Sequence, residues 1–113
     1  MSDDMDVMKH KNESIEVKKG IDELFSIIKE IGGKIGRLDE INDLEKFIVI
    51  DTKLKLLPPD TMNMVTMKVS LDEIDQEKTK ITFFAASFDG TIGFKSPQRA
   101  IDMFMEEFEN YSS

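Results

Sequence analysis

Residues 46–56 read KFIVIDTKLKL and form the most strand-like stretch of the chain. Apolar and polar residues alternate along it with a period of two, as in a strand that buries one face. Phe47 and Val49 add apolar side chains to the opposite face near the start of the stretch. We therefore predict a strand over 46–56 that is covered on both faces in its first half. The main buried face is formed by Ile48, Ile50, Leu54 and Leu56.

Downstream of this strand the pattern predicts a hairpin and a final helix. Pro58-Pro59-Asp60 ends the strand, because proline has no N–H to donate to a ladder. Alternation returns over residues 62–71 and 79–88, and the charged residues 72–78 between them are typical of a turn. Asp89-Gly90 and Gly93 mark a loop, and Ser96-Pro97 supplies a capping hydroxyl followed by a proline that can begin a helix. The helix stripe is Ile101, Phe104, Met105 and Phe108.

Upstream, the clearest helix is predicted from about Lys19 to Ile31, where five apolar residues recur at helical spacing. We expect Gly32-Gly33 to end it by adopting a positive φ. Residues 34–41 alternate less clearly, so a strand is favoured there and a short second helix is the alternative. Ile15-Glu16-Val17 predicts a brief first strand, and residues 1–13 are expected to form a disordered, charged tail.

Together these elements predict an α+β fold in the order β-α-β-β-β-β-α. An antiparallel sheet must bury one face, and two amphipathic helices are available to cover it. We expect an antiparallel sheet of about four to five strands packed by both helices. Residues 14–113 are interpreted as a single domain, since 113 residues is close to the commonest domain length.

Composition narrows the classes of function. The chain has no cysteine, which excludes disulfides, thiol catalysis and zinc–thiolate sites. A net charge of −8 disfavours nucleic acid and anionic membranes as partners and favours basic ones. The acidic start of the chain does not resemble a signal peptide, and no apolar stretch approaches the roughly 20 residues that cross a bilayer. We therefore expect a cytoplasmic protein with no membrane insertion.

In layout the chain resembles small helix-grip (Bet v 1 / START-like) α+β proteins, in which a curved antiparallel sheet wraps a C-terminal helix. The resemblance rests on three features and covers most of the predicted ordered chain. They are the early helix with its glycine pair at residues 31–35, the acidic hairpin Leu71-Asp72-Glu73-Ile74-Asp75, and the strand–loop–helix ending from Lys80 to Phe108. It implies the fold, and it implies an apolar-ligand site as an alternative function.

No catalytic, cofactor or metal site is predicted. His10 is the only histidine and lies in the predicted tail, and the acidic residues 72–77 lack the spacing of a calcium-binding loop. Ser87, Asp89 and Thr91 lie close together in the sequence but have no base beside them. Gly33-Lys34-Ile35-Gly36 matches the short GxxG loop of KH domains, which would make the chain a nucleic-acid binder if residues 37–45 were helical.

Methionine and phenylalanine, eight of each, are the remaining unusual feature. We expect a non-enzymatic protein-interaction domain that pairs with itself or another protein through an apolar outer sheet face. The first alternative is a carrier of a small apolar ligand, and the second is an acidic inhibitor or immunity-type protein that binds a basic partner. The predicted outer face comprises Phe47, Val49, Met62, Met64, Phe84 and Phe88. The predicted pocket comprises Leu54, Met67, Phe83, Phe104 and Phe108.

Overall fold

The computed structural model describes residues 9–55, 62–87 and 96–112, and the side chains of residues 11–52, 65–86 and 97–111. The described elements follow the predicted order β-α-β-β-β-β-α, so the α+β prediction is confirmed. They are β1 (Lys9–Val17), α1 (Ile21–Ile35), β2 (Gly36–Asn42), β3 (Phe47–Lys55), β4 (Met62–Asp75), β5 (Lys78–Ser87) and α2 (Ser96–Ser112).

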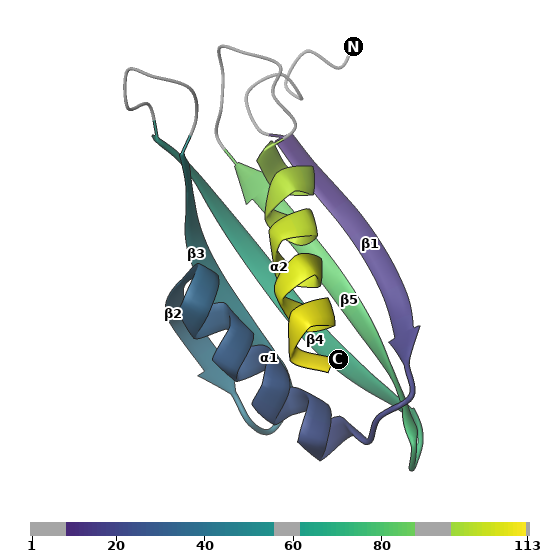
Figure 1. Cartoon of the computed structure of the whole chain (residues 1–113). Helices are drawn as coiled ribbons and strands as arrows, with labels where there is room; N and C mark the ends of the chain where they lie inside the picture. Colours follow the sequence, from purple (N-terminus) through teal and green to yellow (C-terminus); the bar gives the residue numbers. More distant parts are fainter. Residues whose placement is uncertain (1–8, 56–61, 88–95, 113) are drawn as a thin grey trace, which may run out of the picture.

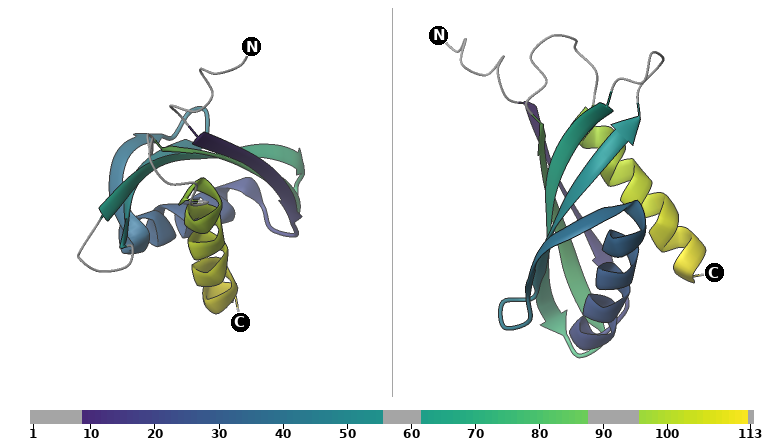
Figure 2. Two further views of the ribbon diagram at one scale, coloured as in Figure 1. Left: turned by 90° about the horizontal axis from the view of Figure 1, so that it is seen from above. Right: turned by 90° about the vertical axis from the view of Figure 1, so that its left-hand side faces the viewer.

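The five strands form one antiparallel sheet in the order β1-β5-β4-β3-β2. Strands β2 to β5 follow one another as a meander, and the first strand, β1, forms the other edge of the sheet beside β5 (Figure 1). The sheet is curved, and both helices lie on its concave side, as the view from above shows (Figure 2). The opposite, convex side carries neither helix, so the two sides of the sheet have different surroundings.

The end of α1 differs from the prediction. The helix continues through Gly32 and Gly33 to Ile35, and none of the glycines in the described residues has a positive φ. Packing explains the difference, because an ideal Cβ on Gly32 would lie only 2.9 Å from Cδ2 of Leu38 and 3.1 Å from Cδ1 of Ile48. Gly32 therefore permits a close approach of the helix to β2 and β3 and does not terminate the helix.

Several strand boundaries also move. Residues 36–42 form a strand, which confirms the favoured interpretation and removes the helix that a KH domain would need after its GxxG loop. Strand β4 continues to Asp75, beyond the predicted end at Leu71, because Asp72, Glu73 and Asp75 pair with β5 around a bulge and leave only a two-residue turn. Strand β1 begins at Lys9, within the stretch predicted as a disordered tail, because Lys9–Val17 pairs with β5 along its whole length. Pro58-Pro59-Asp60 and the loop containing Asp89-Gly90 lie outside the described residues.

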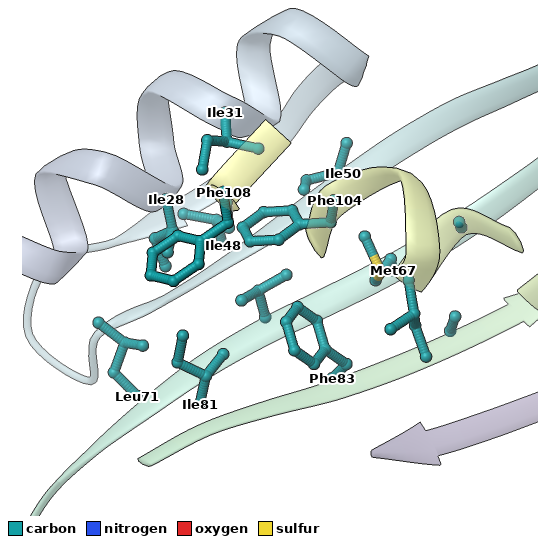
Figure 3. Close-up of a cluster of buried hydrophobic side chains, with 14 of the residues drawn as sticks. Ile28, Ile31, Ile48, Ile50, Met67, Leu71, Ile81, Phe83, Phe104 and Phe108 are labelled. Carbon is teal, nitrogen blue, oxygen red and sulfur yellow. The ribbon is translucent and has the colours of Figure 1, made fainter. Parts of the chain in front are cut away.

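The hydrophobic core lies between the concave side of the sheet and the two helices (Figure 3). Phe83 of β5 and Phe104 of α2 meet edge to face, with ring centroids 5.3 Å apart. Full burial of one such side chain contributes on the order of 2 kcal/mol before entropy is counted. Helix α1 contributes a row of core residues, comprising Leu24, Phe25, Ile27, Ile28 and Ile31.

Two buried threonines are satisfied by backbone carbonyls. The Thr52 hydroxyl donates to the Val65 carbonyl at 3.1 Å, and the Thr79 hydroxyl donates to the Lys19 carbonyl at 2.8 Å. The second bond joins the start of β5 to the segment that leads into α1, so it fixes how the helix enters the core. Neither described helix is long and apolar enough to cross a membrane.

Candidate functional site

Four of the five predicted pocket residues come together, and they fill the core. Met67, Phe83 and Phe104 are fully buried, and Phe108 is nearly so. All four belong to the cluster between the sheet and α2 (Figure 3). The backbone of Leu54 pairs with Asn63, but its side chain lies outside those described. A ligand at this place would have to displace side chains that now contact one another.

The convex face contains part of the second predicted site. Because side chains alternate along a strand, the partners of the buried residues in β1 to β5 point away from the helices. Phe84 is 42% exposed on this face, and Phe47 and Val49 are half-buried. The described side chains that define the convex face are Asn12, Ser14, Glu16, Arg37, Glu40, Asn42, Phe47, Val49, Asp51, Thr66, Lys68, Ser70, Asp72, Asp75, Lys78, Lys80, Thr82, Phe84 and Ala86.

The apolar side chains of the convex face surround one lysine. Lys68 of β4 pairs with Val49 on one side and with Phe84 on the other, so the three residues form a row across the central strands. Its Nζ lies 4.3 Å from the ring centroid of Phe47. A cation above an aromatic ring is attracted to it and partly covers it. The centre of the face is therefore mixed, with an apolar layer and one ammonium group, and less apolar than the sequence predicts.

Polar side chains order the neighbouring part of the convex face. Arg37 Nη2 donates to Asp51 Oδ2 at 3.1 Å, and the Thr66 hydroxyl donates to Asp51 Oδ1 at 3.1 Å. Asp51 is only 15% exposed and so connects β2, β3 and β4 on this side. Nearer β1, the hydroxyls of Ser14 and Thr82 lie 3.4 Å apart. These bonds hold the polar groups of the face in place.

The remaining residues predicted for the outer face cannot be placed by their side chains. Met62 and Met64 lie in β4, where their backbones pair with Lys55 and Lys53, and their side chains are outside those described. Phe88 lies outside the described residues.

Leu44 is a surface residue that sequence reasoning missed. It is 91% exposed in the turn at residues 43–46 between β2 and β3. Both views of Figure 2 show this turn extending beyond the sheet on the side away from the helices. Asn42 Oδ1 accepts a hydrogen bond from the Glu45 N–H at 2.8 Å, and Lys46 has a φ of 60°. A leucine between acidic neighbours in a turn was the signal that could have identified it.

Charge differs between the two sides of the molecule. Among the described side chains, the convex face has four basic residues (Arg37, Lys68, Lys78, Lys80) and five acidic ones (Glu16, Glu40, Asp51, Asp72, Asp75), so their net charge is close to zero. Helix α2 has one described basic side chain, Arg99, against Asp102, Glu106, Glu107 and Glu109. The net negative charge is thus larger on helix α2 than on the convex face.

The described residues show no arrangement typical of a metal site: no three His, Cys, Asp or Glu side chains among them gather closely enough to hold an ion. Tyr111, on the helical side, has a raised pKa. The pKa of Tyr111 is raised by its hydrogen bond to Glu30, then by partial desolvation and by the Glu30 charge. This hydrogen bond joins α2 to α1, as does the ion pair of Lys34 with Glu107. We therefore interpret it as a contact that holds the two helices together.

Comparison with known proteins gives similarity of outline only. No family model and no curated protein matches the chain. A conserved protein from Geobacillus kaustophilus is 17% identical, with a TM-score of 0.49 over 90% of this chain and 91% of that one. The Zhui aromatase/cyclase from Streptomyces sp. R1128 is 12% identical, with a TM-score of 0.47 over 93% and 87% of the two chains. A START superfamily protein from Mycobacterium smegmatis is 9% identical, with a TM-score of 0.43 over 91% of each.

These similarities concern the path of the chain, and nothing about its activity follows from them. The topology agrees with the resemblance seen in the sequence: β1 lies beside the last strand, and the C-terminal helix lies against the concave side of the sheet. The described elements thus have the layout that the resemblance implied, a curved antiparallel sheet around a C-terminal helix (Figure 2).

Proposed function

We propose that this protein is a non-enzymatic interaction module that binds a protein partner through its convex face. One observation carries the proposal. Phe84, 42% exposed, lies on a central strand of a sheet face that neither described helix covers, with Val49 and Phe47 half-buried nearby. When helices cover only one side of an antiparallel sheet, the other side is normally polar.

The composition of the convex face suits a protein contact. Aromatic residues are enriched at interfaces, and most of the binding energy comes from a few central anchors inside a polar rim. Phe84 and Phe47 would be such anchors, and Ser70, Thr82 and Thr66 would belong to the polar surround. The bonds made by Asp51 already hold part of that surround in place, which lowers the cost of ordering it on binding.

A photoreactive amino acid at position 84 tests the proposal, with the same group at position 111 as the matched control. Tyr111 is aromatic and 42% exposed like Phe84, but it lies on α2. We expect an adduct of defined mass from position 84 that excess wild-type protein suppresses and excess Phe84→Asp protein does not. Equal labelling from both positions, or none from position 84, would refute the proposal.

A second candidate is a carrier of a small apolar ligand. The supporting observation is that four of the predicted pocket residues form one apolar cluster between the sheet and α2, which a ligand would enter by displacing side chains such as Phe104 from Phe83. Native mass spectrometry of gently purified protein tests it, because a retained ligand appears as additional mass. We expect the carrier hypothesis to fail if the measured mass equals that of the protein alone and if fatty acids and aromatic probes leave the melting temperature unchanged.

A further inference from the structure

Two copies of this acidic protein repel each other least when they meet through their convex faces. The whole chain carries a net charge of −8, so most approaches of one copy to another are repulsive. Among the described side chains of the convex face, four basic and five acidic residues nearly balance. Lys68 and Asp51, moreover, lie on adjacent strands of the same face, so each copy offers both signs to the other.

The same charges argue against other occupants of this face. A basic partner would be attracted to α2, where four carboxylates stand against Arg99. An acidic partner would be repelled by the molecule as a whole. The nearly neutral convex face therefore favours a partner surface that is itself nearly neutral and partly apolar, and a second convex face has these properties.

Self-association along either edge of the sheet is less favourable, since β1 at one edge carries the charged residues Lys9, Lys11, Glu13 and Glu16. Strand β2 has a bulge between Leu38 and Glu40, and the inserted residue is the charged Asp39. Bulges and charges are features that prevent edge strands from pairing with another chain. The contact we consider is therefore between faces.

The size of the face limits the strength of such a contact. Strands about 4.8 Å apart with a rise of about 3.3 Å per residue give a five-stranded, nine-residue patch of roughly 700 Å². A standard interface buries about 800 Å² per partner. Two convex surfaces touch mainly at their centres, so β3, β4 and β5 would supply most of the contact, roughly 400 Å² per copy. That area suits a weak complex.

We infer that the partner of the convex face is a second copy of this chain, in a symmetric, weak dimer centred on the row Val49, Lys68 and Phe84. This inference rests on the proposed function and names its partner. In a symmetric contact every substitution acts twice, once in each copy. Addition of salt should leave the dimer unchanged or strengthen it, because screening reduces repulsion between two copies of net charge −8.

Sedimentation velocity of the purified chain, at about 10 to 500 µM, measures the association directly. We expect a dimer with a dissociation constant in the micromolar range, weakened about a hundredfold by Phe84→Asp. Tyr111→Asp makes the same charge change at equal exposure on the helical side and should leave the dimer intact. Phe84→Thr, which suits a strand, serves if the aspartate variant does not fold, and circular dichroism confirms folding of each variant.

The outcomes separate this inference from the proposed function. A dimer lost with Phe84→Asp and retained with Tyr111→Asp supports both. A wild-type monomer at every concentration, with competable crosslinking from position 84 to a different protein, overturns the dimer and leaves the interaction module. A monomer with no specific crosslinking from position 84 overturns both. A dimer unaffected by Phe84→Asp places the contact elsewhere and also overturns the inference.

Discussion

Adjacent glycines in α1 should respond to alanine with opposite signs. Gly32 is buried, and an ideal Cβ there would lie 2.9 Å from Leu38 Cδ2, 3.1 Å from Ile48 Cδ1 and 3.2 Å from Ile50 Cδ1. Gly33 is exposed, and no neighbouring atom lies within 4 Å of its ideal Cβ. Both residues are helical, so alanine brings each the same gain in helix propensity, up to about 1 kcal/mol.

The packing cost decides the result at Gly32. Overpacking a well-filled core costs about 1 to 3 kcal/mol. Leu38 is partly exposed and can move, whereas Ile48 and Ile50 are fully buried and have little room. We expect Gly32→Ala to lower the free energy of unfolding by about 1 kcal/mol after the propensity gain is subtracted. Gly33→Ala should raise it by about 0.5 to 1 kcal/mol.

Urea unfolding followed by circular dichroism at 222 nm measures both changes, with an unchanged denaturant dependence as the sign of an intact two-state transition. In thermal scans a difference of 1 kcal/mol corresponds to a shift of about 4 to 8 °C. Leu38→Ala removes the nearest contact, so the penalty of Gly32→Ala should shrink in that background. If Gly32→Ala stabilised the protein as much as Gly33→Ala, the inferred close packing of α1 on β2 and β3 would be wrong.

Three further predictions concern contacts inside the described fold. The pKa of Tyr111 should lie above its ordinary value of about 10, and Glu30→Ala should lower this pKa by removing the hydrogen bond and the charge. A raised pKa favours the neutral phenol. The contact therefore stabilises the fold below about pH 10, and this stabilisation is lost as pH rises through the folded-state pKa. Thr79→Val should lower the free energy of unfolding in urea by about 1 to 2 kcal/mol, since the part-buried Lys19 carbonyl loses its donor. A double-mutant cycle of Phe83→Leu with Phe104→Leu should give a coupling energy of about 0.5 to 1.5 kcal/mol.

Each of these measurements has an internal reference. Absorbance at 295 nm follows Tyr111 alone, because the chain has one tyrosine and no tryptophan, and an identical titration in wild type and Glu30→Ala would contradict the assignment. Thr82→Val is the control for Thr79→Val, since its hydroxyl is only half-buried and meets Ser14 at 3.4 Å. Strictly additive effects of the two phenylalanine substitutions would show that the edge-to-face contact contributes nothing beyond burial.

Periodicity in the sequence determined the element types and their order. Two patterns each allow only one way to bury their apolar residues: the alternation over residues 46–56 and the helical stripe of Leu24, Phe25 and Ile28. A shift of one residue would expose these apolar side chains. These local patterns predicted β3, β4, β5 and both helices, and they placed Phe83 and Phe104 in the core. They also placed Phe47 and Val49 on the opposite side of the sheet from Ile48 and Ile50.

Tertiary packing decided what local patterns leave open. Gly32-Gly33 is a good helix end by propensity, yet the helix continues to Ile35 because the close approach of Gly32 to Leu38 and the packing of Ile35 against the core outweigh the cost of two glycines. The first six residues of β1 become a strand only because β5 offers them a pairing edge. The position of Lys68 over Phe47 depends on side chains from two strands, and the near-neutrality of the convex face depends on all five. Periodicity in the sequence cannot predict these contacts between strands, because they depend on the order of the strands in the sheet.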